Sequence, residues 1–377
     1  MFANGVRALI ERMPATRTTA LALWLDLGSR DETPEEGGVT HFIEHMLFKG
    51  SRRRDVFSLA RAVNSLGGHV NAFTTPEHLC LHATVIAEDQ EAALDLLAEM
   101  LLESIFPADE MKREREVILE EISESEDQPE DLVEEQFYRA LWNDDPLGRP
   151  VIGRRETVSA LKRKRLLDYW RRNYTAQRLL VVAAGAVNER KLLARARRLF
   201  GGLDSGPISG IAPRTRPADG PPRRLTLERD LEQAYFVFGT EGPGRDTPDR
   251  FALLVMNTLY GGGMGSRLFN EIREKRGLAY SVWSTAQAYR DVGTFEIRGS
   301  ASPEKFPALA GIAMAEWKTL LRKAPSRAEV ENAKKQCVRS FILAMEAPAM
   351  RAHRLAEYEF SGLEILSPRN PYGGSRR

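Results

Sequence analysis

Two periods of apolar residues run along this chain, and together they predict a mixed α and β fold. The segments 19–27 and 179–185 are mostly apolar and have the length of a buried strand. The segments 69–75 and 79–86 flank Pro76-Glu77 and predict two paired strands. Helices are expected where apolar residues recur at helical spacing, over 33–50, 56–66, 91–103, 107–122, 129–140, 158–173 and 188–200.

The same order of elements returns in the second half of the chain. A strand is expected at 233–240 and two strands at 279–287 and 293–299, with helices between them around Gly261-Gly262-Gly263. Arg245-Asp246-Thr247-Pro248 also echoes the segment from Arg30 to Pro34. The repeat predicts two copies of one αβ unit.

A segment dense in Gly, Pro and Ser separates the two copies. It runs from Gly201 to Pro222 and is the best candidate for an inter-domain linker. We therefore expect a first half at residues 1–205, a linker at 206–222 and a homologous second half at 223–377.

The helix expected from Thr33 begins with a capping signal and carries the chain's most distinctive motif. Thr33 suits the N-cap, and the sequence His41-Phe42-Ile43-Glu44-His45 follows. His41 and His45 are four positions apart, so both imidazoles lie on one face and can hold one zinc ion. Glu44 projects beside the same ion, where it can take a proton from a water molecule. This His-x-x-Glu-His order is the inverzincin signature.

Chance is the alternative explanation of this motif, because one His-x-x-Glu-His also occurs in unrelated helices. The flanking residues are apolar, however, and include Phe42, Ile43 and Met46. A helix with such flanks is expected to be partly buried, and buried polar groups need partners. A metal ion would satisfy all three polar side chains at once.

The helix expected at 107–122 offers a third ligand. Glu114, Val117, Ile118 and Glu121 follow helical spacing, so two carboxylates fall on its apolar stripe. A carboxylate there is costly unless it is paired or bound to metal. We nominate Glu121 as third zinc ligand and Glu114 as its supporting neighbour. The alternative is a wide stripe with a solvated edge on an ordinary acidic helix.

The second half lacks any equivalent metal site. Alignment on the two Thr-Pro pairs, or on the glycines, places only non-ligands at the motif positions: Val255, Thr258 and Leu259, or Leu253, Met256 and Asn257. The repeat is therefore expected to have one zinc-binding half and one metal-free half.

Composition narrows the function classes. The chain has 54 basic and 53 acidic residues and a net charge of +1, which gives no case for binding nucleic acid or an anionic membrane. No segment is long and apolar enough to span a bilayer, and the N-terminus shows no signal-peptide core. Cys80 and Cys337 are far apart and are expected to be packing residues in a reducing, cytoplasmic setting.

With these motifs in hand, the chain resembles the pitrilysin/insulinase family of zinc peptidases, especially its mitochondrial-processing-peptidase-like branch. The resemblance runs from about Val6 to about Gly362. Residues 41–50 look like the family's zinc helix, and residues 114–121 look like its distal ligand helix. Residues 71–74 resemble the edge strand that pairs with the substrate backbone, and residues 273–280 resemble a segment that reaches the active site from the second half.

The resemblance implies an α+β fold of two similar halves, each a mostly antiparallel sheet packed with helices. In the family these halves close around a chamber, as in a clamshell. It also implies active-site roles for Arg273 and Tyr280. The family pattern has a further helix and strand after Gly362, and the sequence 366–377 departs from it, so we expect the second half to be truncated there.

We therefore expect an endopeptidase with one zinc ion per chain that acts on extended or unfolded peptides. Asn71 to Thr74 lies beside a Gly-Gly turn and can act as an edge strand for the peptide; we expect Asn71, Ala72, Phe73 and Phe48 to contact it, with the two phenylalanines lining one pocket. We also expect a homodimer or a heterodimer with a related chain. The alternatives are a non-catalytic peptide-binding subunit of such a dimer and a purely structural zinc site.

Overall fold

The computed structural model describes residues 1–143, 145–206 and 223–363. The chain forms two compact units that are not contiguous in sequence. The first consists of Met1–Glu124, Arg149–Ala212 and Ala344–Leu366. The second consists of Ser125–Gly148, Pro213–Leu343 and Ser367–Arg377. Among the described residues, no helix is long and apolar enough to cross a membrane.

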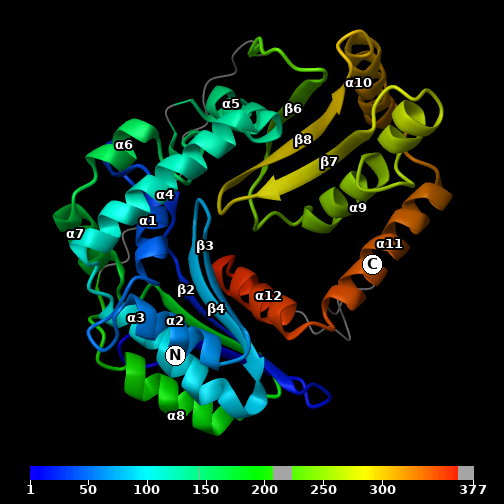
Figure 1. Ribbon diagram of the computed structural model, residues 1–377. Helices are drawn as coiled ribbons and strands as arrows, with labels where there is room; N and C mark the ends of the chain where they lie inside the picture. Colours follow the sequence, from blue (N-terminus) through cyan, green and yellow to red (C-terminus); the bar gives the residue numbers. More distant parts are fainter. Residues whose placement is uncertain (144, 207–222, 364–377) are drawn as a thin grey trace. The chain divides into compact units, whose positions relative to one another are not determined.

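The first unit is built on a five-stranded sheet with the order β1-β5-β2-β4-β3 (Figure 1). Its strands are β1 (Arg7–Arg12), β2 (Thr18–Leu25), β3 (His69–Thr74), β4 (Leu79–Ile86) and β5 (Leu179–Gly185). Only β1 and β5 run parallel; the other neighbours are antiparallel. In the described part of the chain β3 pairs only with β4, so β3 is an edge strand.

Both faces of this sheet are covered, which explains the continuous apolar runs of its strands. Leu21, Leu23 and Leu25 of β2 point into the main core. This core is shared with α1 (Val39–Met46), α2 (Val56–Ser65), α3 (Gln90–Glu103), α4 (Ala108–Asp127), α6 (Arg155–Ala160), α7 (Arg163–Asn173) and α8 (Glu189–Phe200). Trp24 and its alternate neighbours point to the opposite face.

A helix from the end of the described chain covers that opposite face. It is α12 (Pro348–Phe360), whose Ala352, Leu355 and Ala356 pack on Trp24 and Leu180. Arg351 also forms an ion pair with Glu11 of β1, with 2.6 Å between Nη1 and Oε1. A segment near residue 350 therefore completes the first unit.

The second unit has a three-stranded sheet with the order β6-β8-β7. Its strands are β6 (Ala234–Pro243), β7 (Ser281–Ala288) and β8 (Val292–Ala301). The helices α9 (Arg250–Tyr260) and α10 (Phe306–Arg322) and a π-helical turn at Phe269–Glu274 contribute to the core on this sheet. The unit also contains α11 (Arg327–Ala344), whose Cys337 lies 3.2 Å from the Thr258 hydroxyl of α9.

A helix from the middle of the chain belongs to this second unit. It is α5 (Pro129–Trp142), which packs on β6 and is joined to β8 by polar contacts. Arg298 of β8 forms ion pairs with Glu134 of α5 and with the fully buried Glu296. The Tyr138 hydroxyl donates to Glu296 Oε1 at 3.0 Å. Each unit thus includes one helix from the sequence region of the other. In this respect the compact units differ from the halves and linker expected from the sequence, at 1–205, 206–222 and 223–377.

The structure confirms the α+β class, two mostly antiparallel sheets and every predicted strand. Most of the predicted linker and the segment 366–377 lie outside the described residues.

Two predicted helices are wrong in their extent. The helix expected over 33–50 is a 3₁₀ turn at Pro34–Glu36 followed by a separate helix α1, and the helix expected over 158–173 is α6 followed by α7. The first break falls at Gly38, which has a left-handed φ of 88°. A Cβ there would lie 2.7 Å from the Ile152 carbonyl oxygen, so only glycine fits. The second break falls at Leu161, whose backbone is extended.

Candidate metal centre and active site

The motif helix α1 has only eight residues and depends on its surroundings. Its N-terminus is satisfied by Glu32, a buried carboxylate that precedes it in the chain. The two carboxylate oxygens of Glu32 accept hydrogen bonds from the Gly38 and Thr40 backbone amides, each at 2.8 Å. The Thr40 hydroxyl lies 3.0 Å from the Tyr169 hydroxyl of α7. These contacts fix the position and direction of α1 in the core.

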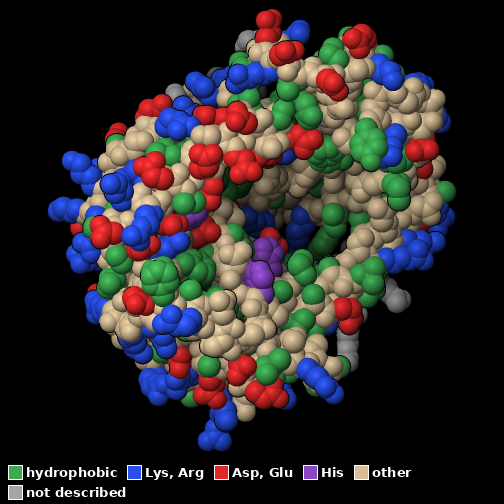
Figure 2. All heavy atoms as spheres, in the orientation of Figure 1, with side chains coloured by type: hydrophobic (Ala, Val, Ile, Leu, Met, Phe, Trp, Pro, Cys, Tyr) green, Lys and Arg blue, Asp and Glu red, His purple; other side chains and the backbone are tan. Residues whose placement is uncertain are grey.

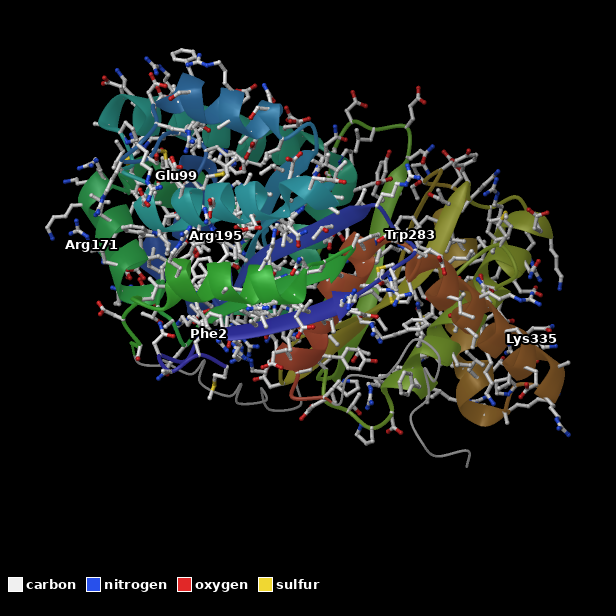
Figure 3. All side chains as sticks on the ribbon, turned by 90° about the horizontal axis from the view of Figure 1, so that it is seen from below. Phe2, Glu99, Arg171, Arg195, Trp283 and Lys335 are labelled. Atoms are coloured by element: carbon white, nitrogen blue, oxygen red, sulfur yellow. The ribbon has the colours of Figure 1, made fainter. Side chains whose placement is uncertain are left out.

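The loop that follows α1 is fastened to α3. Glu99 of α3, labelled in Figure 3, accepts a hydrogen bond from the Ser51 hydroxyl at 2.6 Å and pairs with Arg54. Arg195 of α8, also labelled there, pairs with Asp95 and joins α8 to α3. The helices behind α1 are therefore tied together by ion pairs as well as by apolar packing.

The structure brings the three predicted zinc ligands together. The rings of His41 and His45 have centroids 4.7 Å apart on one face of α1. Glu121 of α4 approaches both: its Oε2 lies 3.9 Å from His41 Nε2 and 3.6 Å from His45 Nε2. One ligand atom of each residue lies within 4.8 Å of the others. Figure 2 shows acidic side chains gathered along α4, the helix that supplies Glu121.

Glu114 holds the second imidazole from behind. Its Oε2 lies 3.1 Å from His45 Nδ1, which leaves His45 Nε2 directed toward Glu121. Its Oε1 lies 2.7 Å from the Lys49 ammonium. A carboxylate on the far nitrogen of a ligating histidine fixes the ring and its tautomer. Glu114 therefore lies against His45, where a supporting carboxylate would be placed, and Lys49 is an unpredicted partner of Glu114.

The electrostatics of His41 favour a neutral imidazole. Burial, and secondarily the neighbouring His45, lower the pKa of His41 to about 3. Its Nδ1 is buried and has no hydrogen-bond partner among the described residues. A neutral imidazole nitrogen is the form that binds metal. Two imidazoles and one carboxylate form a donor set that suits zinc and keeps a fourth position open, so these residues fit the metal.

Glu44 lies on the same helix but is held apart from the three ligands. Its Oε2 accepts a hydrogen bond of 2.6 Å from the Thr74 hydroxyl at the end of β3. Burial raises the pKa of the Glu44 carboxyl, while this hydrogen bond opposes the shift. A carboxylate with a raised pKa beside a metal site is suited to accept and return a proton.

The predicted substrate-binding residues divide between the two faces of the sheet. Ala72 of β3 faces the main core, where the partly buried Phe48 also packs. Phe73 faces the other side and meets Trp24, with ring centroids 5.3 Å apart. The prediction that Phe48 and Phe73 line one pocket of this sheet is therefore wrong, because successive strand residues point to opposite faces. Asn71 is exposed, and its Oδ1 accepts a hydrogen bond from the Ala72 amide at 2.9 Å.

Arg273 and Tyr280 belong to the second unit, where they lie together. The Arg273 guanidinium carbon lies 4.9 Å from the Phe269 ring centroid and 4.8 Å from that of Tyr280. Tyr280 itself is 79% exposed. Gly277, with a φ of 56°, ends the helical turn that bears Arg273, as expected from the sequence. The pair therefore forms an accessible cation–π group.

Three residues of the site were missed by sequence reasoning. Glu32 contacts the backbone amides of Gly38 and Thr40, and Lys49 contacts the distant Glu114 side chain; no local pattern reveals either contact. The alternation of strand residues predicts that Thr74 lies on the same face of the sheet as Ala72, but it does not predict the hydrogen bond to Glu44. The stripe that led to Glu121 also contained an error: Val117 is 44% exposed, and the buried residues of α4 are Met111, Glu114, Ile118 and Ile122.

Comparison with known proteins agrees with this geometry. Residues 7–155 match the family model described as insulinase, peptidase family M16, and residues 160–337 match the model of the peptidase M16 inactive domain. An uncharacterized zinc protease of Mycobacterium tuberculosis is 38% identical over 360 residues, which cover 95% of this chain and 82% of the relative. The chain belongs to peptidase family M16. The description of the second model as inactive agrees with the described residues, in which the group able to hold a metal ion, His41, His45 and Glu121, lies in the first half.

Further relatives are consistent with this membership. The uncharacterized zinc protease YmxG of Bacillus subtilis is 34% identical over 94% of this chain and 86% of its own length. A Pseudomonas fluorescens structure titled as a peptidase M16 inactive domain shares the fold with a TM-score of 0.89 at 23% identity, covering 97% of this chain and 88% of its own. A protease structure from Helicobacter pylori has a TM-score of 0.87 at 21% identity, covering 96% and 89%. Family membership supports a peptidase, and the names of the relatives imply zinc.

The contacts among His45, Glu114 and Glu121 predict how two substitutions change the affinity of the chain for zinc. His45→Ala should abolish stoichiometric zinc binding because it removes one of three ligands. Glu114→Gln should weaken zinc binding by about 10- to 100-fold, the usual effect of losing such a supporting carboxylate. Zinc competition with a chelator measures both. His69→Ala, an exposed histidine of β3, is the matched control, and full zinc binding by His45→Ala would contradict the ligand assignment.

Proposed function

We propose that this M16 chain is a zinc-dependent endopeptidase that hydrolyses extended or unfolded peptides. The observation that carries the proposal is the convergence of His41, His45 and Glu121 beside a separate, half-buried carboxylate, Glu44. A structural zinc site has no need of that free carboxylate. A non-catalytic peptide-binding subunit would have no need of the complete ligand set.

The ligand residues would hold one zinc ion per chain through two imidazole nitrogens and one carboxylate oxygen. Zinc, when bound, supplies a Lewis acid that polarises a peptide carbonyl and makes a neighbouring water more acidic. Glu114 keeps the His45 ring oriented for this task, and Lys49 neutralises the Glu114 charge.

Glu44 would act as the general base and then as the general acid. Its half-buried carboxylate would accept a proton from the attacking water and return it to the nitrogen of the departing amine. Burial favours this exchange because it raises the proton affinity of the carboxylate.

The edge strand β3 would receive the substrate. An unpaired strand edge can bind an extended peptide by backbone hydrogen bonds, while side chains contribute alternate pockets. The Asn71 side chain accepts from the Ala72 amide, so an incoming peptide carbonyl would replace that oxygen. In this proposal Asn71 and Ala72 contact the peptide backbone, and Phe48 and Phe73 contribute to different surfaces.

Arg273 and Tyr280 would act from the second half. A phenol can donate a hydrogen bond to the oxyanion of the tetrahedral intermediate, and a guanidinium can hold the same oxygen or the substrate backbone. The cation–π contact supports a joint role, because the Tyr280 ring orients the Arg273 guanidinium. Arg273 and Tyr280 would act either on the site of their own chain or on that of a partner in a homodimer or a heterodimer with a related chain.

We also propose that the protein works in the cytoplasm.

The role of Glu44 is tested by Glu44→Gln, which keeps the shape of the side chain and removes the base. Zinc should remain at one ion per chain, and peptide hydrolysis should fall by at least about 100-fold. Turnover of a quenched fluorescent peptide and zinc analysis of the same sample measure the two effects. Near-normal turnover would show that Glu44 is not the base, and absence of zinc-dependent hydrolysis by the parent chain would refute the proposed function.

The edge-strand model predicts selectivity for unfolded substrates. A protein held in its native fold should be spared, while its reduced and alkylated form should be cut, because only an extended segment can pair with β3. Gel analysis and mass spectrometry of the fragments compare the two. Equal cleavage rates for both forms would contradict the model.

The proposal for the second half predicts that Tyr280→Phe keeps its zinc and its fold but loses about tenfold to a thousandfold in turnover, as for a removed oxyanion donor. A mixture of Glu44→Gln and Tyr280→Phe chains distinguishes action within one chain from action across chains, since only the latter restores activity. If Tyr280→Phe alone matches the parent, the phenol has no role in the reaction.

A further inference from the structure

We propose that Thr74 is a positioning residue for Glu44, so that the strand proposed to bind the substrate also orients the base. The inference rests on the proposed function, because it assigns Thr74 a role through the Glu44 carboxylate. Neither the motif nor the comparisons give Thr74 this role; the sequence placed it only at the end of the edge strand.

The hydrogen bond between Thr74 and Glu44 is short and specific. The Thr74 hydroxyl donates to Glu44 Oε2 at 2.6 Å from the last residue of β3. Within the described chain, no hydrogen bond to Glu44 Oε1 is found. One carboxylate oxygen is thus held and the other is left to accept the proton.

The end of β3 is itself held rigidly by the segment that leads to α1. The Ser29 amide donates to the Thr75 carbonyl at 3.3 Å, and the Arg30 amide donates to the Pro76 carbonyl at 2.8 Å. Gly28 permits this approach, since a Cβ there would lie 2.4 Å from the Thr75 carbonyl oxygen. The strand end and the chain before the motif helix are therefore in backbone contact.

A buried ion pair strengthens this connection. Arg30 Nη1 lies 2.8 Å from Glu77 Oε1, and each side chain is only 2% exposed. Breaking such a pair leaves an uncompensated buried charge, so the pair constrains the two segments to one geometry. Thr74 is consequently fixed relative to α1 by the contacts of the three residues that follow it, Thr75, Pro76 and Glu77.

Fixation of the carboxylate matters because Glu has three side-chain torsions and reaction requires one arrangement. A displacement of about 1 Å of a catalytic group can cost about 100-fold in rate. The Thr74 hydroxyl selects one arrangement, and it does so from the strand whose free edge faces the peptide. The strand β3 would then fix the position of the bound peptide and, through Thr74, the position of the Glu44 carboxylate that acts on it.

Thr74→Val tests the inference, because valine keeps the shape of threonine and removes the hydroxyl. We expect kcat to fall by about 10- to 100-fold, with KM changed by less than about twofold and zinc unchanged. Thr74→Ser should recover most of the lost rate. Thr84→Val, on the neighbouring strand β4 and on the opposite face, is the matched control and should behave like the parent. Thr74→Ala provides a second hydroxyl-free variant if the valine protein does not fold.

A double variant separates positioning from a general structural effect. In the Glu44→Gln background, Thr74→Val should cause no further loss, since Thr74 acts only through the missing carboxylate. Three results would each overturn the inference while the proposed function stands. They are a further loss of kcat by about 10- to 100-fold in the Glu44→Gln background, loss of zinc in Thr74→Val, and a parental kcat in Thr74→Val. A parent chain that shows no zinc-dependent hydrolysis would instead remove the proposed function and the inference with it.

Discussion

The buried Glu32 carboxylate at the start of α1 is the interaction on which the site depends. An isolated helix of eight residues is not stable in water, and its first amides have no partners inside the helix. Glu32 satisfies two of those amides from a buried position, and its negative charge suits the positive end of the helix. Burial raises the pKa of Glu32 to about 8, but both oxygens accept N–H groups, an arrangement that only the ionised form satisfies fully. This contact sets where His41, Glu44 and His45 point.

Partial burial of α1 then affects the protonation of its polar side chains in different ways. It keeps His41 neutral and ready to bind metal, and it raises the proton affinity of Glu44. His45 instead has Glu114 behind it, and Lys49 balances that carboxylate. One short helix in one apolar core thus presents the two proposed ligands and the proposed base, because the surroundings of the three side chains differ.

The sequence predicted the local parts of this arrangement well and the long-range parts poorly. His41 and His45 follow from helical spacing, and β5 follows from an apolar run that matches its observed bounds. Glu121 was found through a stripe that wrongly included Val117, because an apolar residue on an acidic helix need not be buried. The break at Gly38 depends on the approach of Ile152, which lies far along the chain. The packing of α12 on the first sheet also had no local signal, since any amphipathic helix can cover either sheet.

One zinc ion is expected to bind where α1 and α4 meet. Anomalous X-ray scattering at the zinc absorption edge, from crystals of the zinc-loaded chain, tests it directly. One strong peak per chain is expected, about 2.0–2.2 Å from a nitrogen of His41, a nitrogen of His45 and an oxygen of Glu121. A stoichiometric peak at any other group of residues, or a peak that lacks any one of these three ligands, would contradict it.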